Sequence, residues 1–183
     1  MTTGHDLVVG GSGMLAGLCE ALAREDRIVS VIGRDQGRLQ RLVQRHPNIR
    51  PLSVDYRDAE ALERSLVAAE TASGPIERAV CWIHTVAPDA PVIVGRRTKR
   101  ALWHVLGSAA ADPAEPGRLD RWRQRFSALS PLDYRIIVLG FVSGAEGSRW
   151  LTDAEISAGV KHALDTEAPL SIVGTVEPWS ARP

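Results

Sequence analysis

The stretch Leu7-Val8-Val9-Gly10-Gly11-Ser12-Gly13-Met14-Leu15-Ala16 decides the fold of this 183-residue chain. It begins with apolar residues typical of a buried strand, passes through three glycines, and continues into residues 14–24, which have helix-forming composition. A strand, a glycine-rich turn and a helix in this order make up the first unit of a dinucleotide-binding domain. The stretch therefore predicts a site for a dinucleotide near the amino terminus.

The three glycines have different expected tasks in this turn. Gly10 can adopt backbone angles that are closed to other residues, and Gly11 and Gly13 lack the Cβ that would keep a pyrophosphate from the main chain. Free N–H groups at the start of the following helix then face the phosphates, and the helix dipole favours negative charge there. A tight turn can also use glycine for structural reasons alone. We assign to the cofactor site Gly10, Gly11, Ser12, Gly13, Met14 and Leu15.

Composition excludes several classes of protein. Lys+Arg and Asp+Glu both number 22, so the formal net charge is zero, and no basic block points to nucleic acid. No apolar run approaches the roughly 20 residues that span a bilayer. Cys19 and Cys81 each lie in an apolar segment, which is typical of buried core cysteines in a cytoplasmic protein. The histidines lack metal-binding spacing, so we expect no metal site. A homodimer is compatible with the sequence.

Strand-like and helix-like segments alternate along the chain. Six strands are predicted at residues 6–10, 27–33, 49–54, 76–83, 101–106 and 134–142, and residues 170–176 allow a seventh. Helical patterns lie between them. Right-handed crossovers between parallel strands give a doubly wound sheet, and the expected strand order is 3-2-1-4-5-6 in a single domain spanning residues 1–183.

Ligands of such sheets bind at the carboxyl ends of the strands, so the residues after each strand are the candidates. An acidic residue after the second strand would bind the ribose hydroxyls of NAD, but this chain has Gly33-Arg34-Asp35 there. The Arg34 guanidinium can hold a 2′-phosphate through paired charge-assisted bonds, and Arg38 can add a second cation. We therefore expect NADP as the cofactor. NAD stays open because Asp35 is also present, although that residue equally suits a helix cap.

Further candidates follow the third and fourth strands. Asp55 can accept a bond from the adenine amino group or can simply end its strand with a turn, and Tyr56 stands beside it. His84 follows the fourth strand and should project toward the nicotinamide, where an imidazole can act as a proton donor near pH 7. The alternative is a packed loop histidine without a catalytic task.

The sequence resembles the short-chain dehydrogenase/reductase superfamily over about its first 110 residues. The resemblance rests on residues 10–16, Gly33-Arg34-Asp35, the strand end Val54-Asp55 and the strand end at residues 105–108. It implies an NAD(P)-binding Rossmann fold and, for Ser108, a hydrogen bond to a substrate carbonyl.

The chain departs from this family at the acid catalyst, which is a tyrosine followed four residues later by a lysine. Tyr56 is followed at that spacing by Glu60, and Tyr134 by Val138. The resemblance is therefore to an atypical member that lacks the Tyr-x-x-x-Lys pair. We expect an NADP-dependent oxidoreductase of a small carbonyl- or imine-type substrate, with His84 and Ser108 beside the nicotinamide. The alternative is a catalytically silent NADP-binding sensor or regulatory protein.

Overall fold

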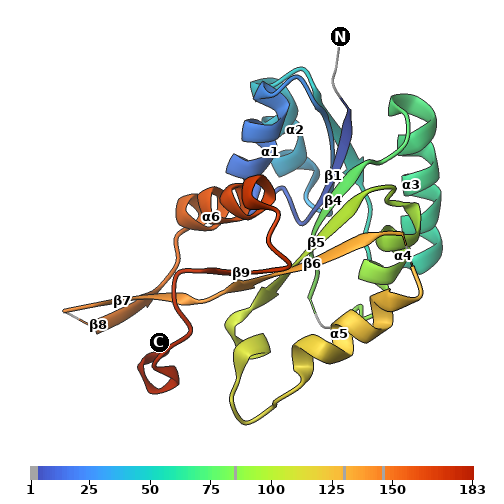
Figure 1. Ribbon diagram of the computed structural model, residues 1–183. Coiled ribbons are helices and arrows are strands. Elements are labelled where there is room, and N and C mark those ends of the chain that lie inside the picture. Colours follow the sequence, from blue (N-terminus) through green and yellow to red (C-terminus); the bar gives the residue numbers. More distant parts are fainter. Residues whose placement is uncertain (1–3, 85, 130, 146) are drawn as a thin grey trace.

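A computed structural model describes residues 4–84, 86–129, 131–145 and 147–183 and contains a seven-stranded parallel sheet (Figure 1). The predicted order is confirmed, because the strands run β3-β2-β1-β4-β5-β6 and the seventh, β9, joins at the β6 edge. All six neighbouring pairs are parallel. The strands are β1 (His5–Val9), β2 (Ile28–Gly33), β3 (Ile49–Ser53), β4 (Arg78–Trp82), β5 (Ala101–Gly107), β6 (Asp133–Leu139) and β9 (Leu170–Val173).

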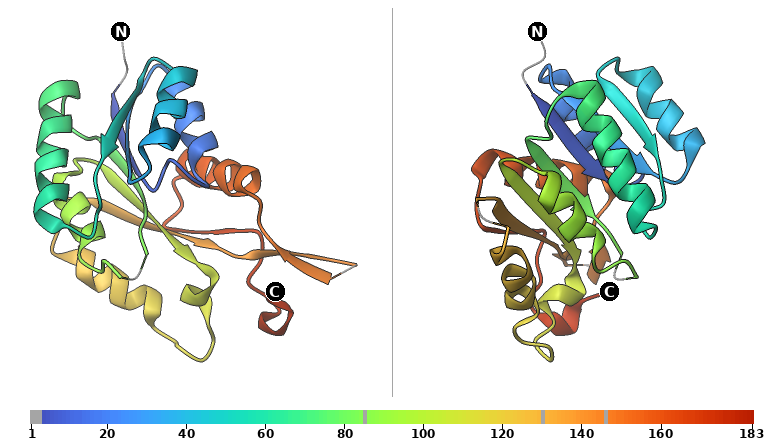
Figure 2. Two further views of the ribbon diagram at one scale, coloured as in Figure 1. Left: turned by 180° about the vertical axis from the view of Figure 1, so that it is seen from behind. Right: turned by 90° about the vertical axis from the view of Figure 1, so that its right-hand side faces the viewer.

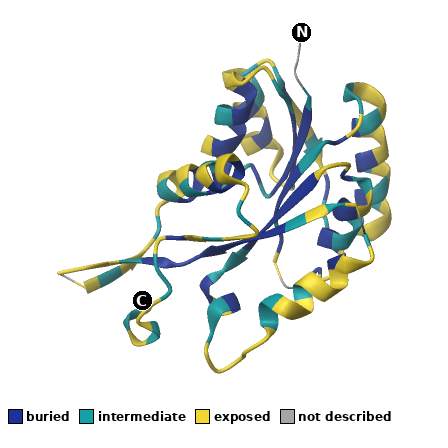
Figure 3. Cartoon of the chain, viewed as in Figure 1, coloured by how far each residue is buried: buried dark blue, intermediate teal, exposed yellow. Residues whose placement is uncertain are grey.

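Helices cover both faces of the sheet (Figure 2). One layer consists of α1 (Ala16–Arg24), α2 (Gln36–Arg45) and α6 (Asp153–Thr166), and the other of α3 (Ala59–Ser73), α4 (Ala90–Arg97) and α5 (Arg118–Ser127). Each layer packs its own apolar cluster against the sheet, so the central strands are buried on both sides while the outer helix faces stay exposed (Figure 3). Burial on both faces explains why these strands are nearly continuous apolar runs in the sequence.

The helix starts follow local capping rules. The Asp35 carboxylate accepts a hydrogen bond from the Arg38 backbone N–H at 2.9 Å, which caps α2. Asp58 caps α3 in the same way. Thr152 and Glu155 form a reciprocal capping box at the start of α6. Each cap satisfies N–H groups that the helix itself leaves without partners.

Polar side chains at the amino end of the sheet have a structural role. Asp6, at the start of β1, is 2% exposed, and its carboxylate accepts two hydrogen bonds from the guanidinium of Arg27 and two from that of Arg78. His5 bonds Ser30 Oγ through Nε2 at 2.8 Å. These groups tie β1, β2 and β4 together at the end opposite to the expected ligand site.

The sixth strand is shorter than its sequence pattern predicts. It ends at Leu139, because at Gly140 the main chain lies directly against the backbone of Thr175 and leaves no room for a Cβ. Phe141 then bridges Thr175 and opens a separate antiparallel hairpin. This hairpin, β7 (Phe141–Gly144) and β8 (Gly147–Trp150), extends away from the sheet (Figure 1).

Candidate active site

The glycine-rich turn between β1 and α1 requires glycine at its first position. Gly10 has a φ of +79°, in the left-handed region that side chains disfavour. A Cβ there would also lie 2.7 Å from the carbonyl oxygen of Trp82. The predicted task of Gly10 therefore matches the geometry, with Trp82 as the neighbour that makes the approach close.

Gly11 and Gly13 differ in what lies beside them. A Cβ on Gly11 would lie 2.7 Å from Cys19 Sγ and 2.9 Å from Val8 Cγ1, in the core, so this glycine serves packing between α1 and the sheet. The open space predicted beside Gly11 is absent. A Cβ on Gly13 would have Arg38 Nη1, at 3.9 Å, as its nearest neighbour. Gly13 is thus the position at which a ligand can approach the main chain.

The turn that leads into α1 presents backbone donors. In the described part of the chain, nothing accepts a hydrogen bond from the backbone N–H of Ser12, Met14 or Leu15. The Leu15 side chain is fully buried in the core, so only its main chain can contribute to a site. Met14 is held by Ser157 of α6, whose Oγ donates to the Met14 carbonyl at 2.8 Å. Unpaired N–H groups at a helix start favour an anion.

A pocket of about 500 Å³ lies over this turn and is called here the turn pocket. It brings together most of the predicted cofactor residues, but Gly11, Leu15 and Asp55 are not among its lining residues. The lining residues are Gly10, Ser12, Gly13, Met14, Ile32, Gly33, Arg34, Asp35, Arg38, Tyr56, Trp82 and His84.

Two guanidinium groups stand at the β2 end of the turn pocket. Arg34 is exposed and has no ion-pair partner among the residues that the structure describes. Arg38 lies 3.4 Å from the Asp35 carboxylate. The pKa of Asp35 is lowered, first by the hydrogen bond from the Arg38 backbone N–H. Asp35 therefore acts as a helix cap, and the arrangement leaves Arg34 available to an anionic ligand.

Asp55 is engaged beside the pocket. Its carboxylate accepts hydrogen bonds from the Arg57 side chain and backbone, and these bonds lower its pKa to about 2. The adenine contact predicted for Asp55 stays a prediction, since the carboxylate already has a partner. Tyr56, the next residue, lines the pocket, and its Oη accepts a hydrogen bond from the His84 backbone N–H at 3.4 Å.

A second pocket of about 550 Å³, called here the apolar pocket, opens on the other side of Trp82. Trp82 and His84 line both pockets. The indole reaches from Gly10 at the end of β1 toward Gly107 at the end of β5 and so forms the ridge between them. The other lining residues are Ile83, Ala87, Pro88, Pro91, His104, Val105, Leu106, Gly107, Ala109, Ala110, Arg118, Arg121, Trp122 and Arg125.

His104 contributes a polar group to the wall of the apolar pocket, although its place within a strand predicts a structural residue. Burial lowers the pKa of His104 to about 3, so the ring is neutral. Burial raises the pKa of Tyr134, so its hydroxyl keeps its proton. The Tyr134 hydroxyl lies 2.9 Å from His104 Nδ1, and when the hydroxyl donates this hydrogen bond the single N–H of the neutral ring is on Nε2.

Ser108 is not part of either pocket. It lies in the short 3₁₀ turn η1 (Ser108–Ala111), 5% exposed, and its Oγ accepts a hydrogen bond from Arg182 Nε at 2.8 Å. The Arg182 guanidinium also stacks on Trp150 and Trp179. The substrate contact predicted for Ser108 stays a prediction, and the observed geometry ties this serine to the C-terminal segment.

The described residues include no helix with the length and apolarity of a membrane span. They also hold no group of three or more His, Cys, Asp or Glu side chains placed for a metal ion. Burial raises the pKa of both Cys19 and Cys81, which keeps these thiols protonated.

Comparison with solved structures identifies the fold as that of short-chain dehydrogenases. A short-chain dehydrogenase from Bacillus anthracis superposes with a TM-score of 0.74 at 14% identity, covering 96% of this chain and 97% of its own. One from Streptomyces avermitilis gives 0.72 at 15% identity, with 95% and 89% covered. A metagenomic short-chain oxidoreductase in complex with NADP gives 0.68 at 13% identity, with 96% and 97% covered. No protein-family model and no curated protein matches the sequence.

Proposed function

We propose that this protein is an NADP(H)-dependent oxidoreductase acting on a small carbonyl- or imine-type substrate. One observation carries the proposal: the turn pocket and the apolar pocket meet at Trp82 and His84. A dinucleotide in the first pocket and a substrate in the second would be in contact at this ridge. The fold shared with solved dehydrogenases, one of them in complex with NADP, agrees with the proposal.

The turn pocket suits a dinucleotide phosphate on its own geometry. Gly13 leaves the main chain open, and the Ser12, Met14 and Leu15 amides lack partners within the described chain. Arg34 would hold a 2′-phosphate. Because the Asp35 carboxylate caps α2 and pairs with Arg38, we propose NADP rather than NAD as the cofactor.

When bound, NADP(H) supplies or accepts the hydride. His84 is proposed to hold the proton that the substrate oxygen or nitrogen gains or loses, because it is exposed at the junction and an imidazole exchanges protons near neutral pH. The Tyr56 hydroxyl accepts a hydrogen bond from the His84 backbone N–H. The Trp82 ring lies edge-on to the imidazole at a centroid distance of 5.6 Å.

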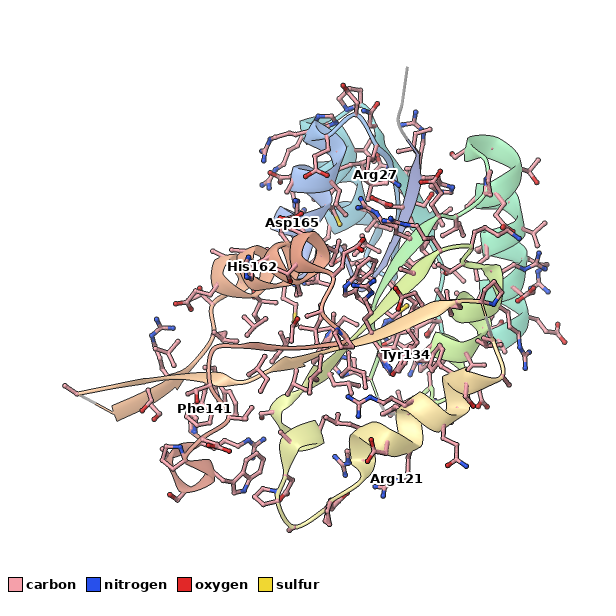
Figure 4. All side chains as sticks on the ribbon, in the orientation of Figure 1. Arg27, Arg121, Tyr134, Phe141, His162 and Asp165 are labelled. Carbon is pink, nitrogen blue, oxygen red and sulfur yellow. The ribbon has the colours of Figure 1, made fainter. Side chains whose placement is uncertain are left out.

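The test combines binding with turnover. Energy transfer from tryptophan to the nicotinamide gives the Kd of NADPH and NADH, and absorbance at the nicotinamide band follows oxidation against aldehydes, ketones and cyclic imines. His84→Gln should lower kcat by about 10²- to 10⁴-fold without changing the NADPH Kd. His162→Gln, an exposed histidine on α6, is the matched control (Figure 4). A kcat equal in the two variants refutes the role of His84.

A second candidate, a catalytically silent NADP-binding sensor, is favoured by the state of Ser108. Its hydroxyl is engaged by Arg182, and no tyrosine in the chain is followed four residues later by lysine. NADPH binding without oxidation by any compound of the panel would assign this second function. Absence of NADPH binding would exclude both candidates.

A further inference from the structure

The apolar pocket has a cationic side that an apolar substrate alone would not need. Arg118, Arg121, Trp122 and Arg125 lie at positions i, i+3, i+4 and i+7 of α5, so they share one face of the helix. All four line the pocket, and Figure 4 shows Arg121 on α5. No acidic side chain is among the lining residues that the structure describes.

The three arginines differ in how far they are already neutralised. Arg118 pairs with Glu115 and also donates to the Ala109 carbonyl at 3.0 Å. Arg125 pairs with Asp89 at 2.6 Å. The Arg121 side chain has no hydrogen bond or ion pair with any described residue. Its guanidinium is therefore the cation of this pocket that is open to a ligand.

A second polar atom without a partner belongs to His104, which lines the same pocket. Tyr134 is hydrogen-bonded to Nδ1 of His104, and Nε2 of the same ring has no hydrogen-bond partner in the described part of the protein. His104 is 1% exposed, and the Trp122 ring holds its imidazole edge-to-face at a centroid distance of 4.5 Å. Because His104 lines the pocket, its free ring nitrogen is available for a hydrogen bond to a ligand.

We propose that the apolar pocket takes a small organic acid. The carboxylate of this ligand binds the Arg121 guanidinium, its apolar body lies between Trp82 and Trp122, and a further acceptor oxygen bonds His104 Nε2. A guanidinium matches the planar geometry of a carboxylate, while the apolar walls favour an aromatic or branched aliphatic body. The inference deepens the proposed function by naming the substrate class, and it rests on that function only for the claim that the acid is turned over.

Binding of 2-naphthoate to the full chain without added nucleotide tests the proposal, with the neutral isostere 2-naphthamide as the ligand control. Tryptophan quenching or saturation-transfer NMR gives each Kd. We expect the carboxylate to bind at least tenfold more tightly than the amide. Arg121→Gln should remove this preference. Arg123→Gln, on the same helix but outside the pocket lining and paired with Asp120, should keep it.

Equal affinities for acid and amide, equal losses in the two arginine variants, or no binding of either compound at millimolar concentration would each overturn the proposal. The NADPH Kd of the same variants separates this inference from the proposed function. If NADPH binds while 2-naphthoate shows no preference, the substrate class is wrong and the cofactor site stands. If 2-naphthoate binds as expected and NADPH does not, the acid site stands and the oxidoreductase proposal fails.

Discussion

A single methyl group added at Gly11 or at Gly13 should have separate effects, one on folding and the other on binding. The two glycines are two residues apart in one turn, and neither has a positive φ. Alanine at either position therefore causes no backbone strain from a positive φ. The difference lies in what the new Cβ would touch.

At Gly11 the Cβ would lie 2.7 Å from Cys19 Sγ, 2.8 Å from Val31 Cγ1 and 2.9 Å from Val8 Cγ1, all in fully buried side chains. Overpacking of this kind costs about 1–3 kcal/mol. At the middle of that range, the Tm should fall by roughly 4–8 °C for a domain of this size. Gly11→Ala therefore destabilises the fold, and thermal unfolding followed by circular dichroism measures the effect.

At Gly13 the nearest atom to the Cβ would be Arg38 Nη1 at 3.9 Å, so the folded chain accepts alanine without strain. The change should leave the Tm equal or slightly higher, because alanine restricts the unfolded chain by about 0.4–1 kcal/mol. The methyl group would instead occupy the place of a phosphate. Losing one charge-assisted hydrogen bond of about 1.5–3 kcal/mol weakens NADPH binding by about 10- to 150-fold.

Both variants are measured by NADPH titration, which gives the Kd, and by thermal unfolding, which gives the Tm. The reasoning is refuted if Gly13→Ala binds NADPH as tightly as the parent protein does. It is equally refuted if Gly11→Ala keeps the parent Tm.

Three further predictions concern charge. Arg34→Ala should raise the NADPH Kd at least tenfold while changing the NADH Kd less than threefold. Arg24→Ala, at the far end of α1, is the control. Equal losses of affinity for both cofactors would contradict the 2′-phosphate assignment. Burial lowers the folded pKa of His104 to about 3, whereas the unfolded value is near 6.5. The contribution of this group to the free energy of unfolding is therefore fully present above pH 6.5 and decreases as the pH falls below it, by about 2 kcal/mol from pH 6.5 to pH 5. Urea unfolding at both pH values should show this loss in the parent and not in His104→Gln. An equal loss of unfolding free energy in both proteins would contradict the prediction. Asp6→Ala should lower the free energy of unfolding by about 3–5 kcal/mol because it breaks a buried ion pair, and urea unfolding with a loss below 1 kcal/mol would refute this role.

The order of the sheet could be predicted because each crossover leaves a local pattern. Apolar runs buried on both faces alternate with helices whose caps, such as Asp35 and Asp58, are visible in the sequence. The end of the sixth strand could not be predicted. It depends on Gly140 meeting Thr175, a contact between main chains 35 residues apart that no local pattern records.

The residues predicted for the site lie partly around one pocket, and those that lie elsewhere do so for a common reason. A sequence places Gly11 and Gly13 in the same turn but does not reveal that one Cα faces the core and the other the pocket. Likewise, the Ser108 hydroxyl is taken by Arg182, which is distant in the chain. His104 was expected to be structural because it lies within a strand. Its exposure to a pocket depends on α5, whose arginines at helical spacing were the signal that could have been used.

The central claim is that the amides at the start of α1 bind the phosphates of the dinucleotide. Amide-resolved ¹H–¹⁵N NMR during titration with NADP⁺ tests it most directly. The account predicts that the largest saturable shifts occur at the backbone N–H groups of Ser12, Met14 and Leu15, followed by Arg34. Saturable shifts confined to other parts of the sheet, or none at millimolar NADP⁺, would contradict the account.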